Sequence, residues 1–398
     1  MAQEPFTAGR SWLGGLGRNV LVLGVVSLLT DVSSEMLYPV IPLFLTGVLG
    51  APMTVVGLIE GAAEGAASVL KMLFGWISDR AARRKPFVVW GYGLSAVSKP
   101  LMALAGAWPV VLFARLVDRT GKGLRTSPRD ALIAASCRVE QRGTAFGLHR
   151  AMDTAGAVAG PLLALLLLSA WGVGYRAMFV LAFVPAALGV LALAFVRAVP
   201  GETDREAGRL RPARPSLSPA LKQFVAIYGL FALGNSSDVF LLLRAKESGL
   251  GEQGMLLVYV FYNAVYALAA TPAGWLSDRF SRRTVMAGGL AVFAAVYLGF
   301  ALDPTPARIW ILFALYGFYG AAMEGVAKAQ VADLSVPENR GTAMGLLYAV
   351  TGLLAFAASA AAGGLWAKVS SAAPFFYGAA CALAAAGVLA FWRPKSAA

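Results

Sequence analysis

The stretch Gly75-Trp76-Ile77-Ser78-Asp79-Arg80 occurs a second time, 199 residues later, as Gly274-Trp275-Leu276-Ser277-Asp278-Arg279. Each copy follows one long apolar run and precedes another, so each copy lies in a short loop between two hydrophobic segments. Arg142-Gly143-Thr144-Ala145 returns in the same way as Arg340-Gly341-Thr342-Ala343, at an offset of 198 residues. Offsets this similar indicate that the chain was built by duplication of a hydrophobic half.

Composition places both halves in a membrane. Hydrophobic residues make up 58% of the chain and charged residues 14%, whereas a soluble domain carries about 25% charge. A helix needs roughly 20 apolar residues to cross a bilayer core, where its backbone must satisfy its own hydrogen bonds. We therefore predict an all-α polytopic membrane protein with twelve transmembrane helices, at 18–47, 54–78, 86–107, 108–135, 141–171, 174–197, 219–246, 252–277, 284–302, 306–334, 338–368 and 372–392.

The net charge of +13 follows the predicted loops. Its basic clusters lie on alternate loops, which all face the cytoplasm if the N-terminus does, as the positive-inside rule requires. This distribution indicates topology and argues against a nucleic-acid partner. We expect a prokaryotic cytoplasmic membrane, both termini in the cytoplasm, and a first apolar run that spans the bilayer and is not cleaved as a signal peptide. The clusters are 80–85, 138–142, 197–222, 279–283 and 393–395.

One polar segment separates the two halves. It holds Pro200, Pro212 and Pro215 among charges of both signs, a composition that cannot bury a core. We predict an N-terminal six-helix bundle at 1–198, a cytoplasmic linker at 199–218 and a C-terminal six-helix bundle at 219–398.

With these residues in view, the chain resembles the major facilitator superfamily over essentially its full length. The loop Gly75-x-x-x-Asp79-Arg80-x-x-Arg83-Arg84 is similar to that superfamily's signature between helices 2 and 3, and Pro39-Val40-Ile41-Pro42 is similar to an element of its exporters. The resemblance implies a monomer in a lipid bilayer that moves a small-molecule solute through a site between its halves. It also implies a cytoplasmic gate, formed by Gly75, Asp79, Arg80, Arg84, Gly274, Asp278, Arg279 and Arg283.

The predicted helix 5 resembles the antiporters of that family. Gly147, Gly156, Gly160 and Pro161 fit the spacing G-x8-G-x3-G-P of their signature. The family pattern continues two residues on with paired glycines, where this chain has Ala164-Leu165. The resemblance favours export driven by the proton gradient, with no cofactor.

Ionisable residues inside a bilayer are costly and normally face a cavity or a partner, so they mark candidate sites. Asp31 and Glu35 are four residues apart and share a helix face. On the predicted helix 4, five basic residues from Arg115 to Arg129 fall within a sector of about 120°. Arg115 also resembles an intramembrane arginine that is associated with proton coupling in relatives. The proton-coupling candidates are Asp31, Glu35, Glu64, Arg115 and Asp153.

A second set of charged and aromatic residues is predicted to line the solute cavity. The second half of the chain has few intramembrane charges, so we expect it to supply an aromatic wall, with Tyr259, Phe261, Tyr266, Phe318 and Tyr319 as further candidates. The cavity set is Glu60, Lys71, Asp118, Arg119, Lys122, His149, Arg150, Asp238, Tyr262, Tyr316, Glu324 and Lys328.

Several residues have a second interpretation. Arg115 and Asp118 either line the cavity or belong to a structural ion network. Arg125, Arg129 and Asp130 surround Pro128 and are expected in cytoplasmic water. His149 is the only histidine and either relays a proton or packs at a helix end.

Other function classes find little support. Glu60 and Glu64 are placed to share a cation, but the scarcity of His and Cys argues against a transition-metal site, and we expect no metal. No nucleophile with an adjacent base points to an enzyme. We predict a secondary active transporter that works by alternating access, with proton-coupled efflux as its function. Uptake or exchange of an anionic solute or metal chelate is the alternative.

Overall fold

The computed structural model describes residues 16–38, 40–81, 83–197, 199, 217–250, 252–302 and 305–393. Pro39, nearly all of the linker and the side chains of Glu60 and Glu64 lie outside this description, so the interpretations given for them stay predictions. Every regular element in the described ranges is helical, which confirms the predicted fold class.

The first half forms one helical bundle. Prolines in the first turns of α4 and α5 favour helix starts there, because proline lacks only an N–H that has no partner at that position. The elements are α1 (Arg18–Leu37), α2 (Val40–Gly47), α3 (Met53–Arg80), α4 (Lys85–Ala103), α5 (Trp108–Ala135), η1 (Val139–Gln141), α6 (Arg142–Ser169), α7 (Tyr175–Ala192) and η2 (Leu193–Phe195).

The second half repeats this plan. Its elements are α9 (Pro219–Ala232), α10 (Val239–Glu247), α11 (Glu252–Arg279), α12 (Arg282–Ala301), α13 (Pro306–Asp333), η3 (Pro337–Asn339), α14 (Arg340–Lys368) and α15 (Ala373–Phe391). The predicted spans all correspond to these helices, but two of them are interrupted. The span 18–47 divides into α1 and α2, and the span 219–246 divides into α9 and α10. In the described part of the chain, eight helical segments are long and apolar enough to cross a membrane.

The duplication is visible in the turns as well as in the sequence. Gly50, with φ 62°, follows α2, and Gly249, with φ 91°, follows α10 at the corresponding place in the second half. A positive φ favours glycine, because glycine has no Cβ to clash. The two halves therefore share a backbone conformation that the repeated glycine permits.

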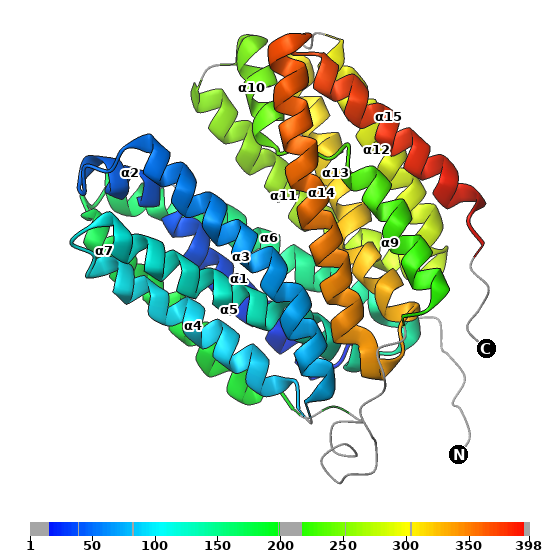
Figure 1. Ribbon diagram of the computed structural model, residues 1–398, viewed down its shortest axis with the longest axis horizontal. Helices are drawn as coiled ribbons and strands as arrows, with labels where there is room; N and C mark the ends of the chain where they lie inside the picture. The colour runs from blue at the N-terminus through cyan, green and yellow to red at the C-terminus, as the bar shows by residue number, and fades with distance from the viewer. Residues whose placement is uncertain are drawn as a thin grey trace.

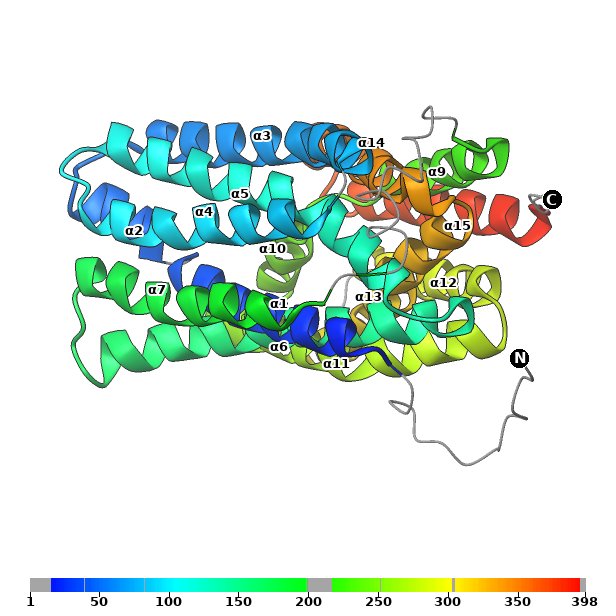
Figure 2. The same cartoon turned by 90° about the horizontal axis from the view of Figure 1, so that it is seen from below.

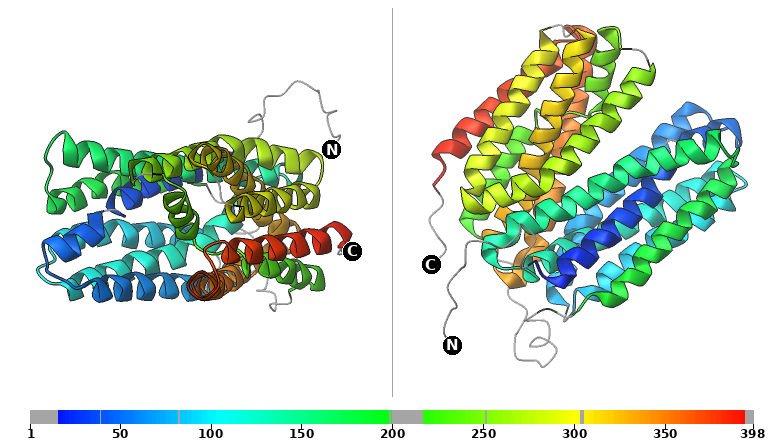
Figure 3. Two further views of the ribbon diagram at one scale, coloured as in Figure 1. Left: turned by 90° about the horizontal axis from the view of Figure 1, so that it is seen from above. Right: turned by 180° about the vertical axis from the view of Figure 1, so that it is seen from behind.

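The two bundles lie side by side and splay apart at one end (Figure 1). They converge where α3 and α14 meet and diverge towards α2 and α10, as the opposite view also shows (Figure 3). The view from below shows α6 beside α11, the pair that joins the halves on one side (Figure 2). We call the converging end, marked by Asp79 and Asp278, the closed end.

Candidate functional site

Asp79 of the first half binds the start of α14 in the second half. Its carboxylate accepts hydrogen bonds from the backbone N–H groups of Gly341 at 2.9 Å and Thr342 at 2.6 Å, and from the Thr342 hydroxyl at 2.7 Å. The first N–H groups of a helix have no partner within the helix, so they form a natural anion site. Arg84 reinforces the contact by donating to Asp79 at 2.8 Å and to the Pro337 carbonyl at 2.7 Å.

Asp278 makes the reciprocal contact with the start of α6. It accepts from the N–H groups of Gly143 at 2.8 Å and Thr144 at 2.7 Å, and from the Thr144 hydroxyl at 2.7 Å. Arg282 donates to Asp278 at 2.7 Å and also binds Asp333. Each repeated Asp-Arg loop thus binds the repeated Arg-Gly-Thr helix start of the other half, and the two sets of hydrogen bonds close one end of the molecule.

The other arginines predicted for the gate contact residues of their own bundle. Arg80 is stacked 3.7 Å from the ring of Trp76 and donates to that residue's own carbonyl. Arg279 lies over Trp275 at 5.5 Å, and Arg283 donates to the Trp392 carbonyl of its own bundle. The arginine that joins the bundles beside Asp278 is Arg282. The offset of 199 residues matches Arg84 with Arg283, but the second loop reaches its pairing arginine one residue earlier.

Glycines allow the backbones to touch at the closed end. A Cβ on Gly274 would lie 2.1 Å from the Gly143 carbonyl oxygen, and a Cβ on Gly75 would lie 2.3 Å from the Gly341 carbonyl oxygen. Real Cβ atoms do not approach a carbonyl this closely, so only glycine fits at either position in this closed arrangement.

Cys137 offers a native probe of the closed end. It lies between α5 and η1, and burial raises the pKa of its thiol from 9.0 to about 11, with Arg142 and Asp278 among the charges around it. The thiolate is the reactive form, so a shift of this size lowers the reactive fraction about a hundredfold at neutral pH. We expect maleimide to label Cys137 slowly at neutral pH. The labelling rate should rise roughly tenfold for each pH unit, until the pH reaches that pKa. Mass spectrometry of a Cys381→Ala variant measures this rate, and rapid labelling at pH 7 would contradict the raised pKa of this half-buried thiol.

Asp31 and Asp153 form a carboxyl pair between α1 and α6. Their carboxyl groups lie close enough to act directly on each other. Ser27 donates to one oxygen of Asp153 at 2.6 Å, and Arg150 donates to the other at 2.7 Å. Two carboxylates this close repel each other when both are ionised, so the pair favours a single shared proton. The pair therefore has the chemistry to hold and release one proton.

The glycines of the antiporter-like motif make this pairing possible. A Cβ on Gly156 would lie 2.8 Å from the Cβ of Asp31, and a Cβ on Gly160 would lie 2.8 Å from the Cβ of Glu35. Gly147, one turn beyond the closed end, approaches α11 in the same way: a Cβ there would lie 2.4 Å from the Ala270 carbonyl. The motif thus brings α6 into backbone contact with the acidic face of α1 and with the other bundle.

Arg150 connects the carboxyl pair to the second half. Besides Asp153, its guanidinium donates to the Tyr266 hydroxyl at 2.7 Å and lies 3.1 Å from the Glu324 carboxylate. It also lies 4.9 Å from the centre of the Tyr266 ring. One arginine is therefore shared by an acid of each bundle, and a change in either acid alters the force between the bundles.

A second polar bridge centres on Asp130. Asp130 is fully buried and pairs with Arg129 at 2.9 Å, and Arg125 is buried as well, so the expectation that these three residues lie in cytoplasmic water is wrong. From the other bundle, the Tyr348 hydroxyl donates to Asp130 and the Lys328 ammonium lies 3.8 Å away. The charges are buried because their partners come from other helices, which an isolated helix pattern does not reveal. Lys71 reaches the same place, 5.3 Å from the Tyr348 ring.

His149 lies between the carboxyl pair and this bridge. It is 1% exposed, and within the described structure neither ring nitrogen has a hydrogen-bond partner. Asp153 and Asp130 are the acids whose charges act on it. The histidine is thus buried about two turns inside α6, and both interpretations given for it, a proton relay and a packing role, stay predictions.

The basic residues in the first half of α5 act on two acids, Asp118 and Glu35. Asp118 binds Lys99 of α4 at 2.7 Å and lies 3.8 Å from Arg115, so these residues form a buried ion cluster inside the first bundle. Lys122 acts on Glu35, and Arg119 and Arg115 act on both Glu35 and Asp118. Lys99 is missing from the predicted set, although a lysine inside an apolar span is the same signal that singled out Arg115.

The aromatic residues of the second half form a packed cluster. Tyr262 and Tyr316 are 8% and 2% exposed, their ring centres lie 5.1 Å apart, and Tyr316 packs at the same distance on Tyr319. The Tyr316 hydroxyl donates to Asp238 at 2.7 Å. Phe261 and Phe318 do not share a ring contact with this cluster in the described structure. Hence only some of the aromatic residues predicted for the cavity wall cluster near Asp238.

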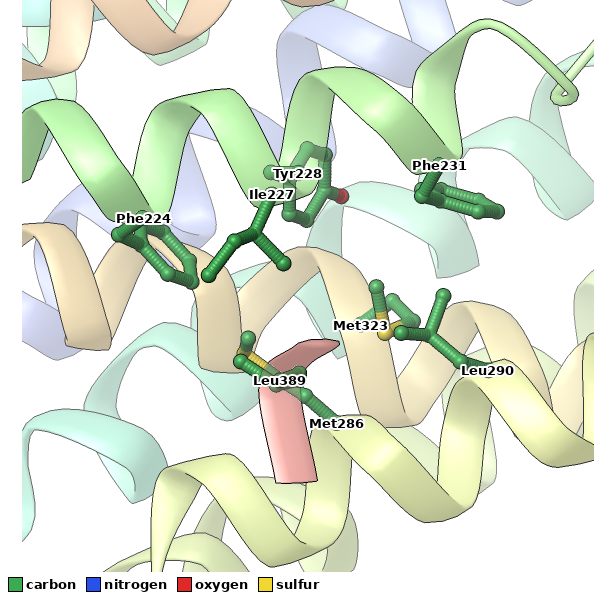
Figure 4. A pocket seen from close by; sticks show the side chains of 8 residues that line it. All are labelled: Phe224, Ile227, Tyr228, Phe231, Met286, Leu290, Met323 and Leu389. Carbon is green, nitrogen blue, oxygen red and sulfur yellow. The ribbon is translucent and has the colours of Figure 1, made fainter. Parts of the chain in front are cut away.

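A small apolar pocket lies behind this cluster, inside the second bundle (Figure 4). Its lining carries a single polar group, the hydroxyl of Tyr228, and the rest is hydrocarbon and thioether. Such a pocket fits a packing gap and does not supply a polar solute site. The lining residues are Phe224, Ile227, Tyr228, Phe231, Met286, Leu290, Met323 and Leu389.

Comparison with known proteins agrees with this architecture. The chain matches the family model of the Major Facilitator Superfamily over residues 23–261 and 220–398. An uncharacterised MFS-type transporter of Methanocaldococcus jannaschii is 37% identical over 382 residues, which cover 94% of this chain and 95% of the relative. The multidrug resistance protein MdtH of an Enterobacter species is 25% identical over 358 residues, with 88% and 86% covered.

The crystal structure of the human organic anion transporter MFSD10 has the same fold, with a TM-score of 0.78 at 18% identity over 94% of this chain and 99% of that chain. Family match, relatives and fold agree with the resemblance seen in the repeated loops and argue for a transporter and against an enzyme. This multi-pass membrane protein belongs to the major facilitator superfamily of transporters.

Proposed function

We propose that the protein exports a small solute across the cytoplasmic membrane in exchange for protons. The observation that carries this proposal is the connection from the Asp31–Asp153 carboxyl pair, through Arg150, to Glu324 of the other bundle. A proton that binds the pair removes negative charge next to Arg150, and the arginine then interacts more strongly with Glu324. Protonation is in this way linked to the contact between the bundles.

The linkage satisfies what exchange requires. Alternating access needs a ligand that binds one conformation better than the other. Asp153 and Glu324 compete for Arg150, so the arrangement of the bundles that brings Glu324 close favours the protonated pair. His149 is placed to pass the proton between the pair and Asp130, because it is buried between them and its ring nitrogens have no hydrogen-bond partner among the described residues.

We place the closed end in the cytoplasm, together with both termini. The repeated loops at this end carry the basic clusters near Arg80 and Arg279, which favours the cytoplasmic side. The structure then corresponds to a state closed to the cytoplasm, held by Asp79 and Asp278, and splayed at the opposite face. Release of both sets of hydrogen bonds would open the cytoplasmic face.

Two further observations support export. The glycines of the antiporter-like motif bring α6 against the acidic side chains Asp31 and Glu35, and the relative MdtH is named a multidrug resistance protein. Arg119 and Lys122 favour a second candidate, uptake or exchange of an anionic solute or metal chelate, because their positive charges act on Glu35. We expect a monomer that needs no cofactor beyond the proton gradient.

Purified protein in proteoliposomes with an internal pH dye tests the proposal. We expect a solute among lipophilic cations, organic anions or metal chelates to move protons in the opposite direction, in proportion to its own flux. Glu140→Gln, an exposed carboxylate in η1, should leave this exchange unchanged. Solute flux without proton movement in any condition would reject proton coupling and favour the facilitated exchange of an anion.

A further inference from the structure

The seventh span is broken near its middle. α9 ends at Ala232 and α10 begins at Val239. Between them the N–H groups of Gly234 and Asn235 return to carbonyls three residues back, the N–H of Ser236 bonds to the Gly234 carbonyl at 3.2 Å, and the N–H of Ser237 bonds to the Ser359 hydroxyl at 3.1 Å. Regular helical hydrogen bonding is therefore lost over one to two turns of a membrane span.

The fold does not require this break. Ser236-Ser237-Asp238 matches Ser33-Ser34-Glu35 of the first half, where α1 continues unbroken to Leu37. Irregular backbone at membrane depth is tolerated only where protein buries it or where it lines a hydrated site. Half-helix ends at such breaks expose carbonyl groups that bind ions. The first span is interrupted as well, but later, between the end of α1 at Leu37 and the start of α2 at Val40. A break at the Ser-Ser-Asp position is thus found in the second half alone and needs its own explanation.

Three oxygen-bearing side chains gather at the break. Asp238 uses one carboxylate oxygen to accept from Tyr316, at 2.7 Å. The Tyr297 hydroxyl, on a side chain that is 1% exposed, makes no hydrogen bond of full geometry in the described structure, although the Ser236 side chain lies beside it and the Asp238 charge acts on it. The side-chain oxygen of Asn235 is also shielded from the surface and finds no donor among the described residues.

Unsatisfied buried oxygens are rare and call for a partner. The groups at the break are a carboxylate, an amide oxygen and a phenol, and the C-terminal end of α9 adds its partial negative charge. Oxygen ligands with a single full negative charge suit a hard cation of low charge. Arg150 and Glu324 are the other charged groups whose fields reach Asp238, and their charges oppose each other.

We propose that the break between α9 and α10, with Asp238, Asn235 and Tyr297, binds a monovalent cation, either an alkali ion or the ammonium group of a solute. The two sources share one chemistry, a single positive charge among oxygen ligands. The site is distinct from the Asp31–Asp153 pair, which lies in the other bundle. The cation would complete the hydrogen-bonding and charge requirements that the broken helix leaves open.

Thermal unfolding of the purified full-length chain in detergent tests the proposal. Sodium, potassium or methylammonium chloride is titrated against N-methyl-D-glucamine chloride at constant ionic strength. A ligand that binds only the folded state raises the unfolding temperature in a saturable way. We expect such a rise with at least one of the three cations and an apparent affinity about tenfold or more weaker in Asp238→Asn.

Matched variants make the outcomes separable. Glu247→Gln at the end of α10 removes a carboxylate that pairs with Arg244 at 3.0 Å and should leave the titration unchanged. Asn235→Ala should weaken the affinity even if Asp238→Asn fails to fold.

A response to sodium or potassium identifies an ion site, and a response to methylammonium alone identifies a site for a solute ammonium. No response, or a response that survives both Asp238→Asn and Asn235→Ala, overturns the proposal. Asp31→Asn should retain the response, so the result is independent of proton coupling.

Discussion

Replacing Gly274 by alanine is expected to open the closed end and to abolish transport. The new Cβ would lie 2.1 Å from the Gly143 carbonyl oxygen, a backbone atom that cannot turn away as a flexible side chain can. Overpacking of this kind costs about 1–3 kcal/mol, and each 1.4 kcal/mol changes a population about tenfold. The closed state should therefore become about ten- to a hundredfold less populated. Each bundle should still fold, because the clash lies between the bundles.

The rate of alkylation of Cys137 in a Cys381→Ala background reports the change. We expect faster labelling in Gly274→Ala and in Gly75→Ala, whose Cβ would lie 2.3 Å from the Gly341 carbonyl. Gly288→Ala in α12 is the matched control, because nothing lies within 4 Å of its added Cβ. Unchanged labelling and transport in both gate variants would show that the close backbone approach is not needed for closure.

Much of the closed end could be predicted from the sequence, because duplication left two copies of each part. The repeated Asp-Arg loop and the repeated Arg-Gly-Thr helix start are both readable as patterns. Their reciprocal pairing is not, since Asp79 meets Gly341 and Asp278 meets Gly143 only after the two bundles have packed. Arg282 escaped prediction because one residue fewer separates it from its aspartate than separates Arg84 from Asp79.

Pairs between helices were the hardest features to predict. Asp130 was expected in water because its neighbours Pro128 and Arg129 suggest a helix end, yet Tyr348 and Lys328 from the other bundle bury it. Sequence spacing relates residues on one helix face but carries no information about the partner helix. The break in the seventh span was missed for a different reason. One glycine and a few small polar residues are weak signals of a break within a long apolar run.

Replacing Asp153 by asparagine is expected to uncouple solute movement from proton movement. Asparagine keeps the size of the side chain but has no negative charge, so Arg150 loses its ion pair at 2.7 Å and keeps Glu324 as its acidic partner. Hydrogen bonds to charged groups contribute about 1.5–3 kcal/mol each, enough to shift the preferred arrangement of the bundles at least about tenfold. In proteoliposomes, proton movement evoked by a solute should fall to background while exchange of that solute continues.

Asp31→Asn gives a second, sharper test of the same pair. If the two carboxyl groups hold a single proton between them, removing either one removes the site, and the double variant should be no more impaired in proton movement than each single variant. Independent proton sites would instead give losses that add. Glu140→Gln, an exposed carboxylate outside the network, should behave like the unaltered protein. If both single variants moved protons with the pH dependence of the unaltered protein, neither side chain would carry the transported proton. The coupling site would then lie elsewhere.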